Sequence, residues 1–152
     1  MTPPPRSLEQ RWTDTRHRLE HDVDVWVATA DPADATPYLV PLSFLWDGET
    51  LLLSTAEHSP TGRNLRDTGR VRLGIGPTRD VVMVEGTVEM LRAEELPDGV
   101  GDAFAAKTGF DPRRSRYPYF RVRPERIQAW REVNEIADRD LLRNGQRVTE
   151  AG

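Results

Sequence analysis

The chain has 152 residues, of which 37% are hydrophobic and 30% charged, a composition that fits one soluble globular domain. It contains no cysteine, which excludes disulfides, thiolate metal sites and cysteine nucleophiles. The formal net charge of −4 argues against a general nucleic-acid binder, and no apolar run is long enough to cross a membrane. Because the first residues, MTPPPRSLEQ, have no apolar core of a signal peptide, we expect a cytoplasmic protein.

The first residues are expected to be an arm followed by a helix. Residues 1–6 are proline-rich and predict a flexible arm, with residues 7–152 forming a single domain. Ser7 and Gln10 have the spacing of a capping box, which predicts a helix that ends near His21.

Alternation of apolar and polar residues predicts about six strands. They are expected at residues 23–29, 38–46, 50–55, 70–75 and 81–91, with two short strands at 119–122 and 127–130 on either side of Pro124. Asp47-Gly48 predicts a tight hairpin, and Gly86 predicts a bulge.

Helical segments are expected between and after these strands. One turn is predicted at residues 64–68, a helix at 93–107 interrupted near its start by proline and glycine, and a terminal helix at 132–143. This order predicts a mainly β (α+β) fold: a six-stranded antiparallel split barrel of Greek-key type with peripheral helices.

The second predicted strand is apolar on both faces, although a single-layer barrel buries only one. Its other face must therefore meet a helix, a ligand or another subunit. Pro41 lies in the middle of this strand and cannot donate a ladder hydrogen bond, so it marks an edge, a bulge or a break in pairing.

The segment 51–65, LLLSTAEHSPTGRNL, is the strongest candidate for a binding site. An apolar strand leads into hydroxyl side chains, a glycine and Arg63, and a guanidinium presents a planar fork of donors that matches phosphate oxygens. An ordinary polar loop is the alternative interpretation. No acid–base pair or nucleophile motif identifies catalytic residues, and we expect no metal site.

The order of these features resembles the pyridoxamine 5′-phosphate oxidase-like family of flavin and deazaflavin oxidoreductases, which are split β-barrels that bind their cofactor across a dimer interface. The resemblance rests on five segments and the tail: VWVATADP at 25–32, PYLVPLSFLWDG at 37–48, LLLSTAEHSPTGRNL at 51–65, GRVRLGI at 69–75, VVMVEGTVEML at 81–91 and RPERIQAWREVNEIADRDLLRNG at 123–145.

The resemblance implies where a cofactor would bind. Its phosphate would lie near Ser54, Thr55, Ser59, Thr61, Arg63 and Asn64, and its ring system along Val40, Pro41, Leu42 and Ser43. Many members of the family carry lysine at the position of Thr61. Arg63 and Arg79 would then supply the positive charge, and Trp130 in the tail could stack on the flavin.

The resemblance also implies a function. We expect an FMN-binding oxidoreductase that transfers hydride between the flavin and a small organic substrate, in a homodimer whose sites lie at the interface. Two alternatives remain open at this point: a deazaflavin-dependent reductase of the same fold, and a non-catalytic flavin- or haem-binding protein that stores or senses its ligand.

Overall fold

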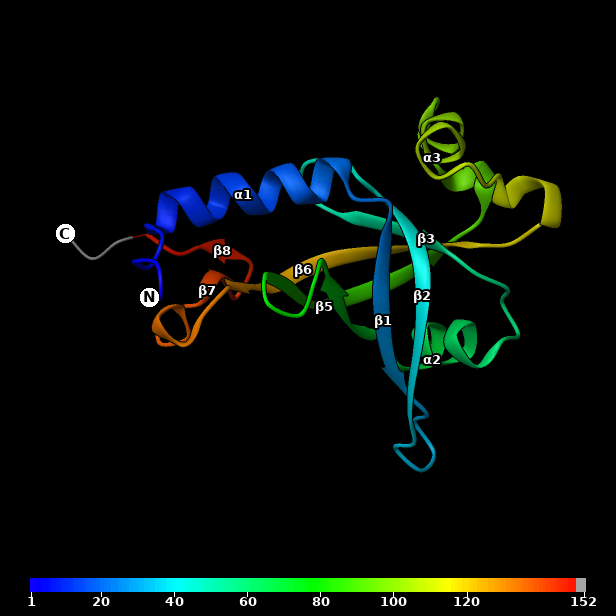
Figure 1. Cartoon of the computed structure of the whole chain (residues 1–152). Coiled ribbons are helices and arrows are strands. Elements are labelled where there is room, and N and C mark those ends of the chain that lie inside the picture. Colours follow the sequence, from blue (N-terminus) through cyan, green and yellow to red (C-terminus); the bar gives the residue numbers. More distant parts are fainter. Residues whose placement is uncertain (150–152) are drawn as a thin grey trace.

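The computed structural model describes residues 1–149, which form eight strands, three α-helices and three short 3-10 turns (Figure 1). The helical elements are α1 (Leu8–His21), α2 (Pro60–Thr68), α3 (Val100–Thr108), η1 (Ala93–Glu95), η2 (Pro112–Ser115) and η3 (Val133–Glu135). The strands are β1 (Asp24–Ala30), β2 (Pro37–Trp46), β3 (Leu51–Ser54), β4 (Arg70–Ile75), β5 (Val81–Leu91), β6 (Tyr119–Trp130), β7 (Asp140–Arg143) and β8 (Gln146–Arg147).

Strands β1 to β6 close into an antiparallel barrel, which confirms the predicted fold class. The order β4-β1-β2-β3 is a Greek key, and β6 completes the circle by pairing with both β5 and β3. Only residues 119–122 of β6 pair with β3, whereas Ile127 and Gln128 pair with β7. The barrel is therefore split along β6, and β7 and β8 extend the sheet beyond the split.

The strand β6 is continuous, where the sequence predicted two short strands. The predicted bulge is confirmed, because the register between β5 and β6 shifts at Glu85 and Gly86. Gly86 pairs with Pro124, and a Cβ at Gly86 would lie 2.4 Å from the carbonyl oxygen of Arg123. Because only glycine allows this approach, the sheet accommodates Pro124 without interrupting the strand.

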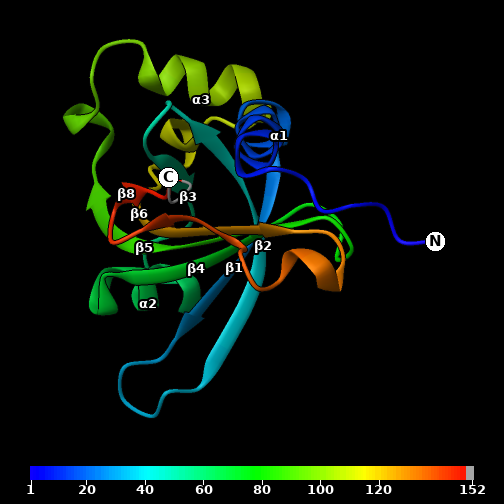
Figure 2. The same cartoon turned by 90° about the vertical axis from the view of Figure 1, so that its left-hand side faces the viewer.

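The three α-helices lie on two sides of the barrel, with α1 and α3 opposite α2 (Figure 2). Helix α1 packs beside β2, β6 and β7 and inserts Trp12 and Leu19 into the main core. Helix α3 places Phe104 against Leu52 and Tyr119 on the outer side of β3. Within residues 1–149, no helix combines the length and apolar character that a membrane span requires.

The outer face of the β1–β2 hairpin is only partly covered. Leu45 packs under α3, but Leu39 and Trp26 are 61% and 52% exposed. Pro41 lies beside Trp26, in the part of β2 that pairs with β1 and not with β3. The amide of Phe44 donates to the carbonyl oxygen of Val23, on the β1 side of the strand. Successive residues of a strand direct their backbone groups to opposite sides, so the nitrogen of Pro41 faces the other, free edge of β2. Pro41 therefore marks an edge, as one of the sequence interpretations proposed.

Two predicted helices differ from the structure. The prediction of a terminal helix at 132–143 is wrong. This segment forms η3 and β7, because Asp140–Arg143 pairs with β6. The helix at 93–107 is a 3-10 turn followed by α3 from Val100, since Pro97 and Gly99 separate the two. Helix α2 begins at Pro60, four residues before the predicted turn.

Candidate functional site

The predicted phosphate loop leads from β3 into the first turn of α2. Ser59 caps this helix: its Oγ accepts from the amide of Gly62 at 3.0 Å and donates to the carbonyl oxygen of Ala56 at 2.8 Å. A Cβ at Gly62 would lie 2.2 Å from that carbonyl oxygen, so the tight turn requires glycine here. The motif SPTG therefore shapes the start of the helix and fixes where Arg63 projects.

Several predicted phosphate ligands have structural partners inside the protein. Ser54 is 6% exposed, and its hydroxyl donates to the carbonyl oxygen of Pro118 at 2.8 Å. Asn64, also 6% exposed, donates from Nδ2 to Oγ1 of Thr29 at 3.1 Å. Thr61 is 3% exposed, whereas Thr55 is half-buried just after the end of the strand.

The charges around this loop leave one guanidinium free. Glu57 accepts two hydrogen bonds from Arg92, at 2.9 and 3.0 Å, which lower the pKa of its carboxyl, and it also lies 3.8 Å from Arg66. Arg66 further pairs with Asp67. Arg63 is exposed on the first turn of α2 and forms no ion pair with any residue in 1–149. Of these cations it alone, within the described chain, has no carboxylate partner.

The predicted ring-binding segment of β2 alternates between the two faces of the sheet. Val40 and Leu42 point inward and pack against the core, whereas Pro41 and Ser43 lie on the outer face. The hydroxyl of Ser43 donates to the carboxylate of Asp24 at 2.6 Å. Pro41 is exposed, whereas Val40, Leu42 and Ser43 are half-buried, so Pro41 and the free backbone edge are the parts of this segment most open to a ligand.

Arg79 and Trp130 lie far from the α2 loop. Val81, at the start of β5, pairs with Trp130 at one end of β6, whereas Ser54 pairs with Tyr119 at the other. At about 3.3 Å per residue these ends are roughly 35 Å apart. Arg79 is exposed and pairs with Glu132 at 3.1 Å, and the guanidinium of Arg139 lies 5.4 Å from the ring centre of Trp130. One chain therefore does not bring the predicted site residues together.

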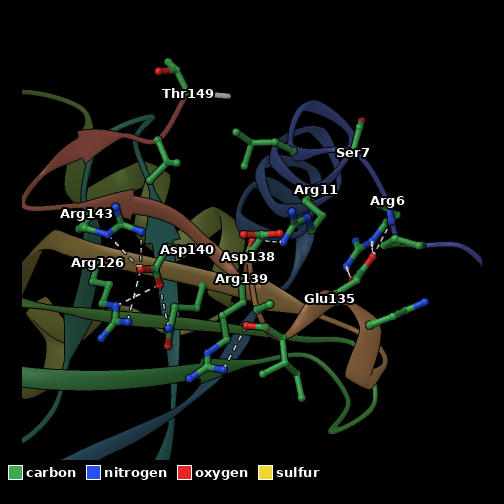
Figure 3. Close-up of a pocket in the computed structure, with 17 residues that line it drawn as sticks. Arg6, Ser7, Arg11, Arg126, Glu135, Asp138, Arg139, Asp140, Arg143 and Thr149 are labelled. Atoms are coloured by element: carbon green, nitrogen blue, oxygen red, sulfur yellow. Dashed lines mark hydrogen bonds and ion pairs between the residues drawn. The ribbon is translucent and has the colours of Figure 1, made fainter. Parts of the chain in front are cut away.

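A cavity of about 680 Å³ lies between the start of α1, η3 and β7, and we call it the terminal cavity (Figure 3). Its charged lining side chains are Arg6, Arg11, Arg126, Glu135, Asp138, Arg139, Asp140 and Arg143. None of these residues is among the cofactor-binding residues predicted from the sequence, although the tail that carries Arg139 was expected to reach the partner's cofactor. Arg11 follows Leu8 by three positions and precedes Thr15 by four, so helical periodicity would have placed this arginine on the buried face of α1.

Ion pairs fix two sides of the terminal cavity. Arg6 binds the buried Glu135 through its backbone amide and its guanidinium, at 2.8 to 3.0 Å. Burial raises the pKa of Glu135, but hydrogen bonds from Arg6 and from the amide of Arg131 outweigh it and lower the pKa to about 2. Asp140 is shared by Arg126 and Arg143, and its pKa is lowered for the same reason against the effect of burial.

Comparison with known families identifies the barrel. The sequence profile described as pyridoxamine 5′-phosphate oxidase matches residues 15–131. The chain belongs to the pyridoxamine 5′-phosphate oxidase family. The expected family is thus confirmed, and the matched range includes β2, the α2 loop, Arg79 and Trp130. No curated protein matches the chain.

Solved structures share the fold of this pyridoxamine 5′-phosphate oxidase family member. An F420 reductase has 22% identity over 74% of this chain and 94% of its own, with a TM-score of 0.59. A FAD-binding protein from Mesorhizobium loti has 20% identity over 76% and 90%, with a TM-score of 0.58. A protein related to general stress protein 26, of the pyridoxinephosphate oxidase family, from Clostridium acetobutylicum has 19% identity over 82% and 91%, with a TM-score of 0.61.

Proposed function

We propose that this protein is a flavin-dependent oxidoreductase, with FMN as the first choice of cofactor and the deazaflavin coenzyme as the alternative. The observation that carries the proposal is Arg63, a guanidinium without an ion-pair partner in residues 1–149, on the first turn of α2 in a chain of this family. A bound flavin supplies hydride transfer.

The residues of the α2 loop fit a phosphate, with fewer donors than the sequence suggested. Arg63 would hold the phosphate by charge-assisted hydrogen bonds, and the hydroxyl of Thr55 would add a neutral donor. The positive end of the α2 dipole favours an anion at the same place. Ser54 and Asn64 would act indirectly, since their bonds to Pro118 and Thr29 fix the two ends of the loop.

We further propose a two-fold homodimer that completes each site. Arg79 and Trp130 stand about one strand length from the α2 loop, so a second copy is the simplest source of these groups for one cofactor. The outer face with Trp26, Leu39 and Pro41 is the apolar surface that such an interface would cover. A stable dimer of this kind should bury on the order of 2,000 Å².

Titration with both cofactors tests the proposed function. The purified protein should bind FMN or the deazaflavin coenzyme at micromolar concentration, as measured by cofactor fluorescence and calorimetry. Turnover of an electron acceptor with the reduced cofactor would support the enzyme. Tight binding without turnover of any acceptor would favour storage or sensing, and failure of both cofactors to bind would refute the proposal.

A further inference from the structure

Arg11 places a buried guanidinium in the wall of the terminal cavity that the described residues leave without a carboxylate partner. The residue is 5% exposed, and its Nη1 donates to the backbone carbonyl oxygen of Asp138. Its Nε is buried without a hydrogen-bond partner, and no carboxylate of residues 1–149 lies within ion-pair distance. A buried cation is costly unless an anion and hydrogen bonds compensate it.

The other residues that line the terminal cavity add further positive charge around Arg11. Five arginines and three carboxylates line the cavity, which leaves a formal excess of two positive charges. Glu135 and Asp140 are occupied by other arginines, and Asp138 is exposed and forms no ion pair within the described residues. Arg139 donates only to the carbonyl oxygen of Ile136, and its Nε also has no partner.

The start of α1 also favours an anion in the terminal cavity. Ser7 and Leu8 line the cavity at the beginning of a 14-residue helix, whose dipole places partial positive charge there. Figure 3 shows Arg11 reaching from α1 toward Asp138, between the ion pair of Arg6 with Glu135 and the cluster on Asp140. The volume of about 680 Å³ is that of a site for a small metabolite.

We propose that the terminal cavity binds a small ligand that bears an oxyanion, a phosphate or a carboxylate, and that Arg11 recognises its charge. Both groups accept two parallel hydrogen bonds from a guanidinium. Apart from Arg126 and Gln128, every lining residue lies outside the range 15–131 that the family profile matches. None of these lining residues is one of the predicted cofactor-binding residues, although Arg139 also lies 5.4 Å from the ring centre of Trp130.

Calorimetric titration with inorganic phosphate and with citrate, at low ionic strength, tests this proposal. Wild-type protein should bind at least one of them at one site per chain, and the stronger of the two distinguishes a phosphate from a carboxylate ligand. Arg11→Gln should weaken binding by about tenfold or more, the loss expected for a charge-assisted hydrogen bond. Arg16→Gln, an exposed arginine of the same helix outside the cavity lining, should bind as wild type does.

Thermal unfolding of the same variants distinguishes recognition from structure. Without added anion, Arg11→Gln should unfold at the same temperature as wild type or higher, because a buried uncompensated charge is removed. It should also lose the stabilisation that phosphate or citrate gives wild type. Arg11→Lys, which keeps the charge but loses the fork, should bind with intermediate affinity. Equal affinity in wild type and Arg11→Gln, no binding of either anion by wild type, or an Arg11→Gln variant that fails to fold would overturn the proposal.

A variant truncated after Thr149 tests whether the cavity binds an external anion or a carboxylate of residues 150–152. Its affinity for phosphate or citrate should equal that of the full chain. Binding that occurs only in the shortened chain would mean that the terminal residues supply the anion themselves, which would refute an external ligand.

Discussion

The start of α2 and the terminal cavity both gather arginines, but they differ in what those arginines contact. At α2 the surrounding polar side chains are satisfied internally, Arg66 and Arg92 have carboxylates, and one exposed cation remains. In the terminal cavity Arg11 and Arg139 have no carboxylate partner within the described residues, and Arg11 is buried. An exposed guanidinium costs little while it waits for a ligand, whereas a buried one lowers stability until an anion arrives. Ligand binding should therefore change stability more at the terminal cavity.

The largest expected effect in this comparison is the acid sensitivity of the terminal cavity. The pKa of Glu135 is about 2 in the folded protein and 4.5 as its ordinary value. The folded state thus holds this proton less tightly than the unfolded state. The stabilisation is complete above about pH 4.5 and is lost as the pH falls toward 2. It amounts to on the order of 3 kcal/mol in the free energy of unfolding.

Urea unfolding between pH 6 and pH 2.5 measures this contribution. Other carboxyls with lowered pKa values, such as those of Asp14 and Asp140, contribute to the same slope. The difference between wild type and Glu135→Gln isolates Glu135. Its size should shrink as the pH falls below 4.5, and a difference that stays constant over this range would contradict the assignment.

An effect of intermediate size is expected on self-association, at the outer face of the barrel that the proposed dimer interface would cover. Trp26→Asp places a charge on the outer face of the barrel and should weaken self-association by about 2 kcal/mol or more, roughly thirtyfold. Cofactor affinity should fall with it. Sedimentation velocity over a range of concentrations measures the dimer, and the control Phe110→Asp changes an exposed aromatic residue that lies outside the β1–β2 hairpin. A wild-type monomer that binds cofactor would refute the shared site.

The smallest effect on folding is expected at α2. Arg63→Ala should weaken cofactor binding by about 1.5–3 kcal/mol, or roughly ten- to a hundredfold, while thermal stability stays nearly unchanged. Arg66→Ala is the matched control, because Arg66 lies one turn away and is occupied by Glu57 and Asp67. If both variants lose affinity equally in the titration, the loop acts as a general basic surface and not as a phosphate anchor.

The sequence predicted the barrel well because its information is local. Alternation in β1, β4 and β5 fixes which side chains point inward, and Gly86 marks the bulge. The segment 132–143 was misjudged because its composition allows a helix, whereas its pairing with β6 depends on a partner that no local pattern reveals. The burial of Ser54 and Asn64 escaped prediction for the same reason, since Pro118 and Thr29 are distant in sequence.

The position of β6 also has a consequence for the order in which the chain folds. Strands β3 and β5 both take their last partner from residues 119–130, so most of the chain must be synthesised before the barrel can close. Until then β3 presents an unpaired, wholly apolar edge at Leu51–Leu53. Pairings between such distant segments form slowly, and open edges favour aggregation. Folding on the ribosome should therefore proceed late, and yield during expression should depend on temperature and chaperones more than stability alone implies.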